Sequence, residues 1–219
     1  DEQHRFGVNQ RLKLKEKAFD YPHQLLLSAT PIPRTMAMGV LSGLDISTIK
    51  TLPPSRIPVT TSTLSNSKRD ALIKRIQNAI TNDSQVYWVC PLIEESDNEL
   101  TGIGELEKIL EKEFSKTDYE IIHGKMKDEE KRGIIKNFKE CKTKILLSTT
   151  VIEVGIDVPD ANIIVIENAE RFGLSQLHQL RGRVGRGAKE SFCILMHNES
   201  LSDISKERLR IIKETSDGF

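Results

Sequence analysis

Two patterns of apolar and polar positions recur along the chain: short apolar runs, and longer segments with apolar residues three and four apart. The runs predict buried strands and the spaced segments predict amphipathic helices. From residue 59 on, strands are expected at 59–64, 86–92, 119–122, 144–148, 162–166 and 191–196, and helices at about 67–80, 103–114, 128–138, 175–186 and 203–214. Strands of this near-continuous apolar kind, alternating with helices, predict an α/β fold with a parallel sheet covered by helices on both faces.

The same alternation occurs before residue 52, which suggests a part of another domain. A charged helix is expected at 9–19, strands at 23–28 and 45–51, and a helix with apolar spacing from Met36 to Leu44. The segment Leu52–Arg56 has two prolines and no periodicity, so it is the best candidate for a linker. We therefore expect two domains, 1–52 and 57–219.

The most informative stretch is SQLHQLRGRVGRG, residues 175–187. Ser175 is a suitable helix N-cap. In a helix from there, one stripe is apolar (Leu177, Leu180, Val184) and another is polar (Gln176, Gln179, Arg183, Arg186). Because Gly182 and Gly185 cost helix stability, we expect a close approach of the backbone to another surface or ligand there.

The arginines of this stretch suggest phosphate chemistry. Arg181, Arg183, Arg186 and Lys189 occur with no acid between Ser175 and Lys189. Guanidiniums that are aimed across a cleft can stabilise the charge that builds on a transferred phosphoryl group. The alternative is a basic surface helix.

Two other stretches carry candidate catalytic or ligand-binding residues. The adjacent acids Asp1 and Glu2 could hold Mg²⁺ and orient an attacking water, or they could be a polar terminus. The small residues Ser28, Ala29 and Thr30 follow a strand and precede two prolines, so they form a loop at the sheet edge where α/β proteins place ligands.

A similar loop follows the strand that ends at Ser148. Thr149 and Thr150 can take a phosphate through hydroxyl and backbone N–H groups. Gly155 permits a positive φ, and Asp157 could accept from a ribose hydroxyl or hold an arginine. An ordinary turn between strand and loop is the alternative. For His123, which precedes a glycine, a structural role is favoured over a catalytic one.

Composition limits the classes of protein. Lysine plus arginine and aspartate plus glutamate both number 32, so nucleic-acid binding would depend on local patches. The three cysteines form no CxxC pair, which favours structural thiols in a reducing cytoplasm. No apolar run is long enough to span a bilayer, so no membrane partner is expected. The chain has no initiator Met, and we interpret it as a fragment of a longer protein.

Taken together, these motifs resemble those of superfamily 2 helicases over almost the whole chain. DEQH at Asp1–His4 resembles motif II, SAT at Ser28–Thr30 motif III, TTVIEVGIDVP from Thr149 motif V, and QLRGRVGR at Gln179–Arg186 motif VI. A more specific resemblance, to the RecG family of bacterial branched-DNA translocases, comes from the sequences DEQHRFGVNQR, LSATPIPRTMAMGVLSGLDIS and HGKMK. Gln3 and the EVGID sequence favour this family over transcription-repair coupling translocases.

The resemblance implies two RecA-like domains with ATP and Mg²⁺ between them. Asp1 would hold Mg²⁺ and Glu2 would be the catalytic base. Gln179, Arg183 and Arg186 would reach the γ-phosphate, with Arg186 as the arginine finger. The remaining roles that it implies are coupling of hydrolysis to DNA contact (Gln3, His4, Ser28, Ala29, Thr30), DNA phosphate binding (Thr149, Thr150) and nucleotide binding (Gly155, Asp157).

The implied protein is an ATP-dependent, monomeric DNA motor that acts on branched, duplex and single-stranded DNA in recombination and repair. The chain contains no GxxxxGK[ST] loop, so we expect it to be inactive by itself. The alternatives are a transcription-repair coupling translocase and a helicase-like module that only binds. The retained Glu2 and the retained motif VI arginines argue against the latter. A dinucleotide-binding Rossmann domain is excluded because no GxGxxG follows a strand.

Overall fold

The structure is a computed structural model that describes residues 57–91, 101–149, 158 and 160–215, together with a few single positions before residue 50. The chain divides into two compact units, one of Asp1–Lys50 with Asp217–Phe219 and one of Thr51–Ser216. The elements below all belong to the second unit. The helices and strands expected before residue 52 lie outside the described residues.

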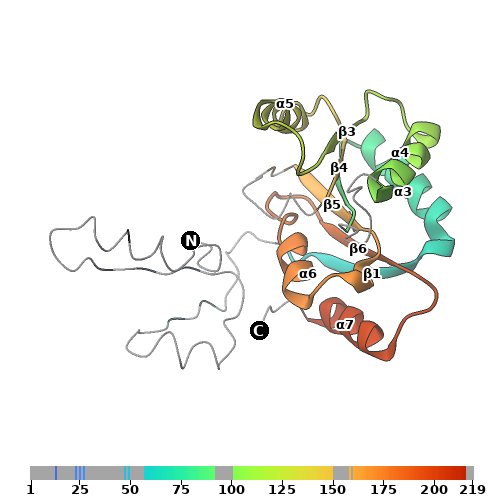
Figure 1. Cartoon of the computed structure of the whole chain (residues 1–219), viewed down its shortest axis with the longest axis vertical. Coiled ribbons are helices and arrows are strands. Elements are labelled where there is room, and N and C mark those ends of the chain that lie inside the picture. The colour runs from blue at the N-terminus through green and yellow to red at the C-terminus, as the bar shows by residue number, and fades with distance from the viewer. Residues whose placement is uncertain are drawn as a thin grey trace. The chain divides into compact units, whose positions relative to one another are not determined.

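The second unit is built around a six-stranded sheet with the order β1-β6-β5-β2-β4-β3 (Figure 1). All five neighbouring pairs are parallel, which confirms the predicted α/β fold class. The strands are β1 (Thr60–Ser65), β2 (Gln85–Val89), β3 (Tyr119–Ile122), β4 (Ile145–Ser148), β5 (Ala161–Ile166) and β6 (Phe192–His197). Each differs from its sequence-based range by at most a few residues at either end.

Helices connect the strands and cover both faces of the sheet. They are α3 (Arg69–Thr81), α4 (Thr101–Glu113), α5 (Asp128–Lys139), α6 (Leu174–Arg181) and α7 (Asp203–Glu214), with short 3-10 helices η2 (Asn66–Lys68) and η4 (Ala169–Arg171). One buried cluster packs α3 and α4 against one face, and the other packs α5, α6 and α7 against the opposite face.

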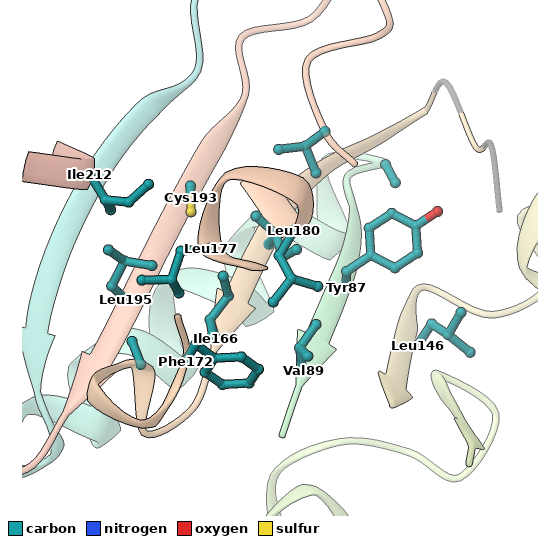
Figure 2. Packing of buried hydrophobic residues seen from close by; sticks show 14 of the residues in the cluster. Tyr87, Val89, Leu146, Ile166, Phe172, Leu177, Leu180, Cys193, Leu195 and Ile212 are labelled. Carbon is teal, nitrogen blue, oxygen red and sulfur yellow. The ribbon is translucent and has the colours of Figure 1, made fainter. Parts of the chain in front are cut away.

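Successive side chains along each buried strand point to opposite faces of the sheet, and this alternation decides which cluster each residue joins. In β2, Tyr87 and Val89 belong to the cluster under α6, whereas Val86 and Trp88 belong to the cluster under α3. Leu177 and Leu180 of α6 lie among side chains of β5 and β6 in Figure 2. All of these side chains are almost fully buried, so α6 is held on the sheet by its apolar stripe.

Because every strand runs in the same direction, the sheet has one carboxyl edge and one amino edge. The loops that follow β3, β4 and β5 leave from the carboxyl edge. The connection from β5 through η4 and α6 to β6 returns the chain to the amino edge. The start of α6 therefore lies toward the carboxyl edge of the sheet, and its end lies toward the amino edge.

Candidate functional site

Helix α6 carries the first of the predicted phosphate-facing residues, Gln179. It begins at Leu174, after Gly173 in an extended conformation. Gln176 Oε1 accepts a hydrogen bond from the Gly173 backbone N–H at 3.0 Å. The prediction that Ser175 is the N-cap is therefore wrong. Ser175 is the second residue of the helix, the N-cap is Gly173, and the Gln176 side chain satisfies the Gly173 N–H.

The helix ends at Arg181, and residues 182–187, here called the arginine turn, continue without helical structure. The Gly182 N–H donates to His178 O at 3.0 Å, and the Arg183 N–H donates to Leu180 O at 3.0 Å. The prediction that Arg183 and Arg186 lie on one helical face is wrong, since a turn carries both. Val184 is still fully buried with the apolar stripe of α6.

The arginine turn approaches another segment at Gly185, where φ is +76°. A Cβ atom there would lie 2.7 Å from Val59 Cγ2. This distance confirms the expected close approach of the backbone at Gly185. Gly182 has an ordinary φ of −67°, and a Cβ atom there would meet only helix carbonyl oxygens at 3.3 Å and 3.4 Å.

The three predicted phosphate-facing residues differ in exposure. Gln179 and Arg183 are half-buried, and Arg186 is exposed. The Arg186 Nε–H donates to Gly182 O at 3.2 Å, which holds the base of the side chain over the end of α6. A planar guanidinium is a group that can form bidentate bonds to a phosphate.

Thr149, predicted to contact DNA phosphate, lies directly after β4 at the carboxyl edge. Its backbone N–H donates to Ile122 O at 3.4 Å, and the residue is 1% exposed. The arginine turn lies at the amino edge, since Gly185 contacts Val59 just before β1 and Ser191 just before β6. The structure therefore places Thr149 and the arginine turn at opposite edges of the sheet.

The other predicted site residues lie outside the described part of the chain. These are Asp1, Glu2, Gln3, His4, Ser28, Ala29, Thr30, Thr150, Gly155 and Asp157. Within the described residues, no group of His, Cys, Asp and Glu side chains could hold a metal ion. Over the same residues, no helix is both long and apolar enough to cross a membrane.

Sequence reasoning gave no separate role to Arg181, which the structure places in the interior. Arg181 is 8% exposed, and its Nη1 donates to Ile212 O at 2.8 Å and to Thr215 O at 2.6 Å at the end of α7. Its Nη2 lies 3.0 Å from His178 Nδ1. One sequence signal was available: Arg181 is four residues after Leu177 and three before Val184, which places it on the apolar stripe.

Replacing Arg181 by alanine is expected to lower the free energy of unfolding by about 2–3 kcal/mol, because the buried Ile212 carbonyl and the Thr215 carbonyl at the end of α7 lose a charged donor. Urea denaturation followed by circular dichroism measures the change. The matched control is Arg171→Ala, since Arg171 is an exposed arginine of the same connection. Equal unfolding midpoints for the two variants would contradict the structural role of Arg181.

A second buried polar group lies at the carboxyl edge, where Glu167 follows β5. Its two carboxylate oxygens accept from Arg69 of α3, Nη1 to Oε1 at 2.6 Å and Nη2 to Oε2 at 2.8 Å. The indole Nε1 of Trp88 donates to the same Oε1 at 2.9 Å. The side chain of Glu167 is 6% exposed, so this carboxylate links α3, β2 and β5 inside the unit.

Two of the three cysteines are buried and behave as apolar core residues. Burial raises the pKa of the Cys193 thiol to about 12 and raises that of Cys90 as well. Both thiols are therefore protonated and unreactive near neutral pH. Cys141 is an exposed free thiol.

Comparisons with known proteins agree on one family. A family model described as "Helicase conserved C-terminal domain" matches residues 57–188. The chain is 50% identical to the ATP-dependent DNA helicase RecG of Haemophilus influenzae and 48% identical to that of Escherichia coli, over 100% of this chain and 32% of each relative. The chain thus spans about a third of the length of these curated relatives.

Solved structures give the same result. A structure of RecG bound to a three-way DNA junction has a TM-score of 0.73 and 38% identity, covering 91% of this chain and 28% of that one. Saccharomyces cerevisiae Dbp5 bound to RNA and ADP BeF3 has a TM-score of 0.64 at 18% identity, covering 94% of this chain and 52% of that one. At this identity Dbp5 supports the fold alone.

Proposed function

Because this chain belongs to the helicase conserved C-terminal domain family, we propose that it is part of a RecG-type ATP-dependent DNA helicase that remodels branched DNA. In that protein, residues 57–219 form the second RecA-like motor domain, and residues 1–52 belong to the first. The protein works in the cytoplasm in recombination and repair, as a monomeric motor on branched, duplex and single-stranded DNA.

The observation that carries this proposal is identity to RecG proteins at 50% and 48% over the whole chain. The match covers 100% of this chain, so it extends over the arginine turn and the stretches that carry the sequence resemblance. The solved RecG structure supports the proposal further, since it is bound to a three-way DNA junction and resembles this chain at a TM-score of 0.73.

The geometry of the described site fits a motor that separates nucleotide contacts from DNA contacts. Gln179, Arg183 and Arg186 would face the γ-phosphate of ATP from the amino edge of the sheet. ATP supplies the free energy, and these donors would stabilise charge on the transferred phosphoryl group. At the opposite edge, Thr149 and Thr150 would contact DNA phosphate, a role that requires Thr149, which is 1% exposed, to become accessible when DNA binds.

The remaining roles of the proposal fall on residues outside the described part. Asp1 would hold Mg²⁺, with Glu2 as the catalytic base. Gly155 and Asp157 would contact the nucleotide. Gln3, His4 and Ser28–Thr30 would couple hydrolysis to DNA contact.

Unwinding of defined DNA substrates by the longer protein tests this function. With ATP, we expect a three-way junction to be unwound at least tenfold faster than a linear duplex of equal length, and we expect branched DNA to stimulate ATP hydrolysis. Equal rates on both substrates would reject branch specificity. ATP-dependent release of a stalled RNA polymerase, without unwinding of the junction, would instead support a transcription-repair coupling translocase.

The 219-residue chain alone is expected to show no DNA-stimulated ATP hydrolysis, because no residue run in it can form the loop that cradles the phosphates of ATP. A phosphate-release assay with and without branched DNA measures this. Hydrolysis by the isolated chain that the Glu2→Gln variant abolishes would contradict the expected inactivity of this chain.

A further inference from the structure

The segment directly before β1, residues 57–59, lies against the arginine turn. A Cβ atom on Gly185 would lie 2.7 Å from Val59 Cγ2 and 3.7 Å from Ile57 O. Real Cβ atoms essentially never come as close as 2.7 Å to another atom. A side chain at position 185 would therefore have no room beside Val59.

Val59 is itself held in place. It is partly buried and packs against the cluster that contains Leu180 and Val184. The next residue, Thr60, donates its N–H to Ser191 O at 2.9 Å, which fixes the start of β1 beside the start of β6. Val59 is thus a fixed surface on which the turn rests.

The conformation at Gly185 decides where the next residue, Arg186, points. With φ at +76°, the chain reverses in a way that only glycine adopts without strain. The Arg186 Nε bond to Gly182 O supplies the second constraint on that side chain. The end of α6 thus holds the Arg186 side chain through this bond, and Val59 limits the position of the residue before it.

We infer that Val59 is a positioning residue for Arg186: its side chain braces the arginine turn and thereby sets the position of the guanidinium. This inference rests on the proposed function of Arg186. A displacement of about 1 Å at a reacting group can reduce a rate by about 100-fold. Loss of the brace should therefore reduce turnover more than nucleotide binding.

The test uses the longer protein with Val59→Ala, Gly185→Ala and the double variant. Gly185→Ala places a methyl group on Val59 and is expected to lower kcat by about 100-fold, with KM for ATP changed by less than about threefold. Val59→Ala, which removes the brace, is expected to lower kcat by about tenfold. The double variant relieves the contact with Val59 but keeps the strain of an alanine at positive φ, so its kcat should lie between those of the two single variants.

The matched control is Gly133→Ala, because a Cβ atom at Gly133 on α5 would meet no atom within 4 Å. Its kcat should equal that of the unmodified protein, and circular dichroism should show each variant folded at the assay temperature. An unchanged kcat of Val59→Ala would overturn the inference, because this variant leaves Gly185 and its positive φ in place. If Gly185→Ala does not fold, Val59→Ala decides alone.

Failure of the inference can be separated from failure of the proposed function. If Arg186→Ala abolishes hydrolysis while Val59→Ala leaves kcat unchanged, only the positioning role of Val59 is wrong. If Arg186→Ala leaves hydrolysis unchanged, the role of Arg186 itself is wrong, and the brace is rejected with it.

Discussion

In the longer protein, Arg186→Ala is expected to reduce DNA-stimulated ATP hydrolysis by about 10³–10⁵-fold, the range that arginine fingers contribute in other nucleotide hydrolases. Arg186 is exposed in the arginine turn, and its Nε–H donates to Gly182 O at 3.2 Å. Because the finger stabilises charge that appears during phosphoryl transfer, binding of ATP should change little.

Two measurements separate these effects: the steady-state rate at saturating ATP and branched DNA, and the affinity for a fluorescent ATP analogue. Arg186→Lys keeps the positive charge but loses the planar fork, so we expect it to restore only a small part of the rate. Lys189→Ala is the matched control, since Lys189 is a cation of the same stretch that donates to Asp83 O at 3.1 Å. Hydrolysis by Arg186→Ala at the unmodified rate would reject the finger.

The fold of the second unit was predictable because each element carries its own periodic signal. Leu177, Leu180 and Val184 were assigned to one buried stripe, and all three are fully buried. The same periodicity misled the prediction about the turn, since it continued the helix through Arg186. The two glycines are the sequence signal for the earlier helix end, since a glycine at 182 directly after the last helical residue and another at 185 are typical of a helix C-terminus.

The helix caps were less predictable than the helices. The S-x-x-D pattern that starts at Ser67 is typical of a helix N-cap, but here Ser65 caps the 3-10 helix η2 before α3 by accepting from the Ser67 N–H at 3.3 Å. At α6, Gln176 rather than Ser175 satisfies the first free N–H. Several hydroxyl and amide side chains within a few residues can make the same bond, so local sequence leaves the choice open.

The buried polar contacts were out of reach for a different reason: their partners are far apart in the sequence. Arg181 contacts carbonyl groups 31 and 34 residues away, and Glu167 meets Arg69 at a separation of 98 residues. Periodicity can place a charged residue on a buried stripe, but it cannot name the group that satisfies it. Such pairs become visible only when the sheet order is known.

The ion pair of Arg69 and Glu167 leads to the largest expected effect on stability. Arg69→Met should lower the free energy of unfolding by about 3–5 kcal/mol, because it leaves the carboxylate of Glu167 buried with the Trp88 indole as its remaining side-chain donor among the described residues. Urea denaturation can be followed by the fluorescence of Trp88, the one tryptophan of the chain, whose indole bonds directly to that carboxylate.

The matched control is the exposed pair of Arg210 and Glu207 on α7. Arg210 also meets its carboxylate through two bonds, at 2.6 Å and 2.9 Å, but the side chains are 58% and 53% exposed. Since water solvates the carboxylate when the arginine is removed, Arg210→Met should leave the unfolding midpoint almost unchanged.

A double variant, Arg69→Met with Glu167→Met, distinguishes the attraction of the pair from the cost of leaving a charge buried. Replacing both partners with apolar side chains removes the unpaired carboxylate, so the double variant should be more stable than Arg69→Met. We therefore expect the unmodified chain and the double variant both to be more stable than Arg69→Met. If the double variant were less stable than Arg69→Met, the carboxylate would be stabilised mainly by Trp88, and the ion pair would not be the dominant contact of Glu167.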